Sequence, residues 1–241
     1  FHEYFIPAGD DLYYTEDNRG PHENNYYNLS LDYRKEFDNP MHELKASVYY
    51  SSNFEKETQD IIENITNSNW EIIAPASDRS RSSEETPEKN IRAQIDYIYP
   101  IKEGVKSEAG LQSRWDIDNS DYIFEDYDPD QNNWINNPDI SNELQYIDAI
   151  QSIYGIYTGT FKKFGYQAGL RTEYDNRYIN QITLNEDYRY EKLHFFPSFY
   201  ITKQFPKQMQ LQLSYSRRIR RPRERDLNPF KEVMDNQNIR A

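Results

Sequence analysis

Apolar and polar residues alternate along several stretches of the chain. In YNLSLDYR, Tyr27, Leu29, Leu31 and Tyr33 share one side of an extended chain, and the residues between them are polar. A period of two is typical of a β-strand with one apolar and one polar face. This pattern predicts an all-β protein without helices, with about eight strands near residues 26–37, 42–53, 90–101, 106–117, 148–161, 165–175, 193–204 and 208–217.

Two of these stretches alternate less regularly. Residues 148–161 carry apolar side chains at both parities, so the pattern does not predict which face points where. Residues 193–203 contain Pro197, and proline in a strand removes a backbone donor and usually marks an edge or a bulge. We predict strands in both stretches.

The predicted strands are joined alternately by short and long connections. Short turns at one end and long polar loops at the other are typical of an antiparallel transmembrane β-barrel, whose long loops face the outside of the cell. Short connections fall at 38–41, 102–105, 162–164 and 206–208; long ones cover 54–89, 118–147, 176–192 and everything after 217.

The two faces of the predicted strands fit a barrel wall. Aromatic residues such as Phe161 and Phe164 gather at strand ends, as in the girdles at membrane–water boundaries, although Tyr and Phe are also simply good strand formers. The polar face would line a wet lumen or pack against a plug. Its charged members are Arg34, Lys45, Arg92, Asp96, Arg114, Arg171 and Glu173.

Composition narrows the class of protein further. Of 241 residues, 36% are hydrophobic and 15% aromatic, the formal net charge is -13, and there is no cysteine. High aromatic content argues against disorder, and the lack of cysteine excludes disulfides. The apolar runs are too short for a membrane helix, and the negative charge disfavours nucleic acid. With Phe1 first and no secretory signal, we expect a mature or excised piece, all of 1–241 belonging to one barrel domain.

The residues give no support for catalysis or a cofactor. The sequence has no nucleotide-binding glycine loop, no zinc motif and no plausible catalytic triad, and its four histidines are scattered. One acidic loop, EDYDPDQNNW, places Asp126, Asp128 and Asp130 at alternate positions, which is how calcium loops begin. Gln131 stands where such a loop needs glycine, so a solvated acidic loop is the competing interpretation of these three calcium candidates.

The most basic stretch is LSYSRRIRRPRERDLNPF at residues 213–230. Its parity places Ser214 and Ser216 toward the lumen. If the strand continues, Arg218 and Arg220 also point inward, while Arg217 and Arg221 lie at the outer rim, near the acidic loops and Glu224 and Asp226. Nucleic-acid binding would use Arg217, Arg218, Arg220, Arg221, Arg223 and Arg225. The adjoining membrane-type strand disfavours that use, and we regard Arg217, Arg218, Arg220 and Arg221 as ligand-binding candidates at the rim.

This stretch, followed by DNQNIRA, resembles a signature of the outer-membrane β-barrel family related to TonB-dependent receptors. YQAGLRTEYD (166–175) and FFPSFYITKQF (195–205) resemble two preceding strands of that family, so the resemblance covers roughly residues 148–241. It implies a barrel of about 22 strands in a Gram-negative outer membrane, plugged by an N-terminal domain. It also implies import of a scarce ligand, such as an iron chelate, vitamin, glycan or peptide, driven by the TonB complex.

Several expectations follow from this resemblance. Neither a plug, a TonB box nor a closing strand is recognisable here, so we expect about eight strands of a larger barrel. A small closed eight-stranded barrel is the other possibility, because open edges cannot sit in a bilayer. The expected partners are outer-membrane lipid, TonB through a plug, and a small or oligomeric ligand, without nucleic acid.

Two other functions stay open. One is a non-transporting barrel with a structural or assembly role. The other is a soluble all-β module that binds glycans through Trp70, Trp115 and Trp134. Trp115 lies on an apolar strand face, where burial or lipid contact is expected, and Trp70 and Trp134 are expected to anchor loops.

Overall fold

The computed structural model describes residues 2–4, 12–73, 78–207, 209–222, 232–235 and 238–240. These residues contain β-strands and no helix, arranged as one large antiparallel sheet and a separate pairing of β12 with β13. The strands are β1 (His2–Tyr4), β2 (Leu12–Arg19), β3 (His22–Glu36), β4 (Glu43–Thr66), β5 (Asp78–Lys102), β6 (Val105–Asp128), β7 (Asn133–Asn136), β8 (Asn142–Phe161), β9 (Phe164–Gln181), β10 (Glu186–Gln204), β11 (Gln210–Ser216), β12 (Glu232–Asp235) and β13 (Asn238–Arg240).

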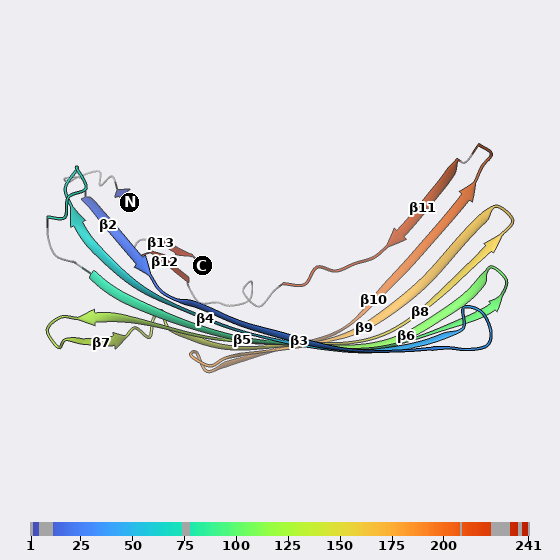
Figure 1. The fold of residues 1–241 in the computed structure, drawn as a ribbon, viewed down its shortest axis with the longest axis horizontal. Helices are drawn as coiled ribbons and strands as arrows, with labels where there is room; N and C mark the ends of the chain where they lie inside the picture. The colour runs from blue at the N-terminus through green and yellow to red at the C-terminus, as the bar shows by residue number, and fades with distance from the viewer. Residues whose placement is uncertain are drawn as a thin grey trace.

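The large sheet is a meander in which each long strand pairs with the next. β2 and β3 both pair with β4, one after the other, and so form a single interrupted strand at this edge of the sheet, where the short β1 also pairs with β2. Counting them together, eight strands run from this edge through β4, β5, β6, β8, β9 and β10 to β11, as the alternation predicts. Figure 1 shows the sheet bent into an open trough. The small closed barrel is therefore wrong for this chain, because the described parts of β3 and β11 lie at opposite edges and do not pair.

The strands are much longer than a membrane requires. β4, β5 and β6 have 24, 25 and 24 residues, whereas a tilted strand crosses a bilayer with about 9–11. The short turns are confirmed, but most of the predicted long loops are wrong, since residues 54–66, 78–89, 118–128 and 176–181 continue the strands. Alternation does not reveal these extensions because polar residues outnumber apolar ones at both parities, although single apolar side chains such as Ile61 and Phe124 are buried there.

The break between β2 and β3 depends on Gly20. The backbone of β4 passes so close that a Cβ on Gly20 would lie 1.5 Å from the carbonyl oxygen of Thr58, and the NH of Thr58 donates to the carbonyl of Pro21 at 3.1 Å. A side chain at this position therefore requires one strand to move away from the other.

We expect Gly20→Ala to separate β2 from β4 locally, with a loss of about 1–3 kcal/mol, the usual cost of overpacking. Amide hydrogen exchange should become faster in residues 12–19 and stay unchanged in β8 and β9. Unaltered exchange in residues 12–19 would contradict this account of the close approach.

The register separates the two faces of the sheet. On one face Leu31 pairs beside Val48, and Ile153 lies beside Leu111; Leu31 is 70% and Ile153 59% exposed. On the other face, Ser152 is buried in a polar row that contains Gln112 and Glu173. This settles the orientation of 148–161: odd positions of β8 join the apolar convex face, and even ones the polar concave face.

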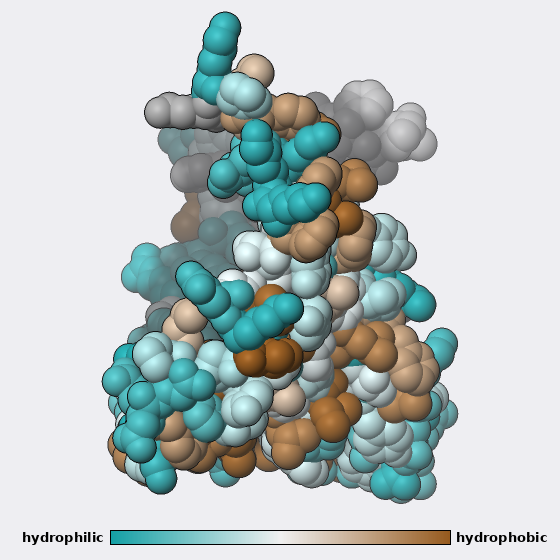
Figure 2. Space-filling model, turned by 90° about the vertical axis from the view of Figure 1, so that its right-hand side faces the viewer, coloured by the Kyte–Doolittle hydropathy of each residue, from teal (hydrophilic) through white to brown (hydrophobic). Residues whose placement is uncertain are grey.

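The apolar side chains are thus mainly on the outside. Figure 2, which looks at the end with the short turns, shows hydrophilic side chains at the tips and hydrophobic ones between them. Among the described residues, no helix is long and apolar enough to cross a membrane. The few buried apolar side chains are Ile61, Val105, Phe124, Leu144, Tyr146, Ala149 and Ile150.

Pro197 lies inside β10 and explains why β11 is short. β10 pairs with β9 on one side and with β11 on the other, and the last register pair with β11 is Ser198 with Ser216. Arg217 still donates its backbone NH to the carbonyl of Pro197 at 3.2 Å. Pro197 has no NH to return toward Arg217, so the ladder ends there and the chain leaves the sheet.

Candidate functional site

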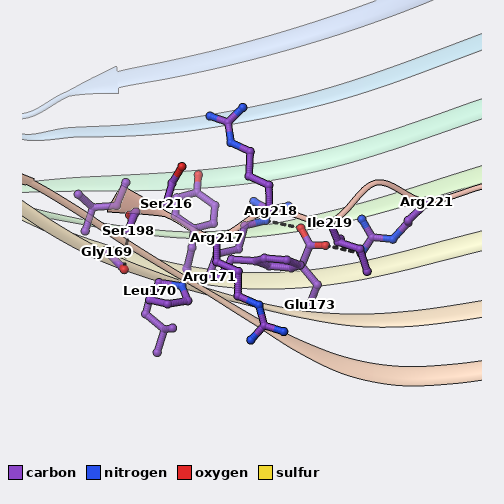
Figure 3. Close-up of a pocket in the computed structure, with 14 residues that line it drawn as sticks. Gly169, Leu170, Arg171, Glu173, Ser198, Ser216, Arg217, Arg218, Ile219 and Arg221 are labelled. Atoms are coloured by element: carbon purple, nitrogen blue, oxygen red, sulfur yellow. Dashed lines mark hydrogen bonds and ion pairs between the residues drawn. The ribbon is translucent and has the colours of Figure 1, made fainter. Parts of the chain in front are cut away.

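The segment 217–222, which we call the strap, leaves β11 and crosses the concave face of the trough (Figure 1). Its Arg221 points at the wall and holds two carboxylates of β9. Arg221 Nε donates to Asp175 Oδ2 at 2.7 Å, and Arg221 Nη2 donates to Glu173 Oε2 at 2.6 Å. Asp175 and Glu173 occupy adjacent concave positions two residues apart, so one guanidinium reaches both. Figure 3 shows Arg221 of the strap beside Glu173 of the wall. Arg221 therefore joins the strap to the barrel wall.

The clamped carboxylates are almost removed from solvent. Asp175 is 1% and Glu173 8% exposed, and Arg221 itself is largely buried. Burial lowers the pKa of Arg221, but its hydrogen bonds to Asp175 and Glu173 outweigh this effect and raise the pKa above its ordinary value. The guanidinium is consequently charged at any pH at which the protein is folded.

A hydrogen-bond network continues from the clamp across the wall. Arg171 Nε donates to Glu173 Oε1 at 2.6 Å, and Arg171 Nη2 donates to Gln112 Oε1 at 2.6 Å and to Ser152 Oγ at 2.8 Å. Gln112 Nε2 then donates to Gln94 Oε1 at 2.7 Å. The network thus runs through neighbouring strands from β9 to β5. It holds Glu173 in position to accept the hydrogen bond from Arg221.

A second group of charges lies beside the clamp on the same face. Arg177 is 3.8 Å from Asp148 and 3.9 Å from Asp175, and Arg114 is 3.8 Å from Asp148. These distances exceed hydrogen-bond length, so the groups attract one another without fixed bonds. Each buried carboxylate of this group therefore faces at least one arginine.

The four arginine candidates of the sequence lie in different environments. Arg217 extends the β11 ladder at an outward register position, and Arg218 and Arg220 are exposed. The predicted rim position of Arg221 is wrong, because the strand ends at Ser216 and the chain turns inward. Arg223, Glu224, Arg225 and Asp226 lie outside the described residues, so their proposed pairs have no structural account.

The three calcium candidates lie in the hairpin that joins β6 to β7. Asp128 Oδ1 accepts hydrogen bonds from the backbone NH groups of Asp130 at 2.9 Å and Gln131 at 3.1 Å. Asp126 Oδ2 accepts one from Asn137 Nδ2 at 2.9 Å. The side chains of Asp126 and Asp128 thus stabilise the hairpin through these hydrogen bonds. The described parts of the chain contain no group of three or more His, Cys, Asp or Glu that could hold a metal ion.

Two of the three tryptophans, Trp70 and Trp134, pack against tyrosine rings. Trp134, in β7, packs edge-on against Tyr127 with ring centroids 5.2 Å apart, and the Arg81 guanidinium lies 4.6 Å from its ring centre. Trp70 packs against Tyr13 at 5.7 Å. Trp115 is 40% exposed on the convex face. These ring contacts of Trp70 and Trp134 fit the predicted loop-anchoring role, and Trp115 is placed for lipid contact.

Sequence reasoning did not find the buried partners of Arg221. Glu173 was expected on the polar face, but Asp175, Asp148, Arg177 and His194 were not singled out. His194 lies on β10 with its ring Nε2 3.9 Å from Asp175. The available signal was the parity of β9, which places Arg171, Glu173, Asp175 and Arg177 in one row on the same face.

Comparison with known families identifies the chain at the level of its fold. The family described as "Outer membrane protein beta-barrel family" matches residues 35–241, from β3 to the last residue. No curated protein matches the sequence significantly. The match favours an outer-membrane location and rules out the soluble module, which would not display such a convex apolar face to water. With its long antiparallel strands, apolar outer face and polar inner face, the chain belongs to the outer membrane protein β-barrel family.

Proposed function

We propose that this chain forms part of the wall of a TonB-dependent receptor that binds and imports a scarce ligand. The observation that carries the proposal is the strap: the concave wall already holds a non-sheet segment through the ion pairs of Arg221. A lumen that must hold a movable plug needs such polar contacts, since they can break and re-form in the presence of water. The sequence resemblance of residues 148–241 points to the same class of receptor.

The lengths of the strands support the same role. Strands of 24 residues leave more than half of their length outside the hydrocarbon, on the side opposite the short turns. In this proposal that side is extracellular and forms a vestibule for an iron chelate, vitamin, glycan or peptide. The chain performs no covalent chemistry, needs no cofactor, and works with TonB through a plug domain.

The test asks whether uptake of a ligand requires both this protein and TonB. Cells that lack this gene, the TonB gene, both or neither are compared for uptake of four labelled probes: a ferric siderophore, cobalamin, a maltodextrin and a short peptide. We expect uptake of one probe to be lost equally in all three mutants, and the complete protein to crosslink to TonB. Normal uptake of every probe without the gene, together with no crosslink, would instead support a structural or assembly role.

A further inference from the structure

A cavity of about 450 Å³ lies between the strap and the concave wall. Its size is within the range of sites for small molecules. One side is formed by wall residues of β8, β9 and β10, and the other by the strap, so the pocket exists only while the strap is docked (Figure 3). The apolar part of the lining includes Tyr154, Ile156, Phe196 and Ile219, and the hydroxyl groups come from Ser198 and Ser216.

The charged part of the lining contains more arginines than carboxylates. The lining includes Arg171, Arg217, Arg218 and Arg221 and one carboxylate, Glu173, but Arg217 occupies an outward register position and Arg221 also pairs with Asp175. Glu173 accepts hydrogen bonds from Arg171 and Arg221, so its charge is already neutralised. Because Arg171 and Arg221 are paired with Glu173 and Asp175, the charge that stays open to a ligand in this pocket is that of Arg218.

Among the described residues, Arg218 is the lining residue with an inward charge that forms no ion pair. Its side chain is exposed and rises from the strap on the concave side (Figure 3), and no ion pair to it occurs among the described residues. Arg171 and Arg221, in contrast, are held in place by the wall network. A free guanidinium beside an apolar pocket can form two parallel hydrogen bonds to a carboxylate while the rest of the ligand contacts the rings.

We propose that this pocket binds a small apolar acid, with the carboxylate of the ligand on Arg218 and its apolar body against Phe196 and Ile219. Arg221 is a positioning residue, because it closes the pocket by docking the strap and does not face the ligand with a free charge. The inference rests on the proposed import function for its biological meaning. Equilibrium binding itself needs neither TonB nor transport, so the two proposals can fail separately.

The probe for the experiment is 4-(trifluoromethyl)benzoate, with the uncharged 4-(trifluoromethyl)benzamide as its counterpart. The complete protein is purified from outer membranes in detergent, and binding of each probe is followed by fluorine NMR against empty micelles. Arg218→Gln is compared with Arg220→Gln, which removes the same charge from the same segment at a residue that does not line the pocket.

We expect saturable binding of the benzoate, a Kd raised about tenfold by Arg218→Gln, and no change with Arg220→Gln. The benzamide should bind more weakly and respond to neither substitution. Equal effects of the two substitutions, equal binding of both probes, or no saturable binding would each overturn the proposal. Loss of TonB-dependent uptake with normal benzoate binding would overturn the import function alone.

Discussion

Replacing Arg221 by methionine is expected to release the strap from the wall while leaving the sheet folded. Methionine keeps much of the length of the side chain and removes its charge. Asp175, 1% exposed, would then lose its close cationic partner, and Glu173 would keep only Arg171. Removing one partner of a buried ion pair typically costs about 3–5 kcal/mol, because the remaining charge stays without solvent.

The strap offers a way to limit this cost. If it swings away, water reaches Asp175 and Glu173, so the penalty cannot exceed the free energy that docks the strap. β9 remains paired with β8 and β10 along its whole length, so the wall should not follow. We expect about 3 kcal/mol, which corresponds to a docked-to-undocked ratio lowered about 100-fold.

The absence of cysteine makes the measurement direct, because a single cysteine at position 220 can carry a nitroxide label. The fraction of mobile label in the electron paramagnetic resonance spectrum reports undocking. In this labelled background, Arg218→Met is the matched control, as it removes a strap charge that has no partner on the wall. The same mobile fraction in both variants would show that Arg221 does not dock the strap. Restored docking in Arg221→Met with Asp175→Asn and Glu173→Gln would confirm that stranded charge is the cause.

The alternation of residues predicted the membrane part of this fold well. One apolar and one polar face per strand is what a lipid–lumen boundary requires, and Leu29, Leu31, Ile95 and Leu111 show it in the structure. The same rule fails in the extensions, such as residues 118–128 of β6, where polar residues outnumber apolar ones at both parities and Phe124 is buried. There the backbone pairing with β5 and β8 sets the structure, and the side chains carry no periodic signal.

The site could be predicted only in part, because its central contact joins distant segments. Arg221 and Asp175 are 46 residues apart, and extrapolating the parity of β11 placed Arg221 on the wrong side. The error originates at Pro197 in the neighbouring strand β10. Because proline has no backbone NH, the ladder of hydrogen bonds between β10 and β11 ends at this position. In the sequence, this proline indicates an edge or a bulge. Its effect on Arg221 depends on whether the backbone of Pro197 faces β9 or β11, and only the strand register shows this.

Replacing Leu31 by arginine is expected to destabilise the barrel in a bilayer, whereas arginine at the adjacent Ser30 should be tolerated. Leu31 is 70% exposed on the convex face and lies between Tyr27 and Tyr33 of the same parity, near the middle of the apolar band. Ser30 is exposed on the concave face. Arginine facing lipid at the midplane costs about 2–4 kcal/mol, while an arginine in a wet lumen keeps its hydration.

Both variants carry the same new charge one residue apart in β3, so strand propensity and net charge are matched. Urea unfolding of the complete protein in phosphatidylcholine vesicles, followed by tryptophan fluorescence, gives the difference in free energy of unfolding. A cost of about 2–4 kcal/mol for Leu31→Arg and near zero for Ser30→Arg would place the convex face in lipid. The reverse order would mean that the sheet curves the other way around its lumen, and the strap, Arg221 and the proposed pocket would then lie outside the barrel. The ranking of these two neighbouring substitutions therefore decides whether any site on the concave face can serve import.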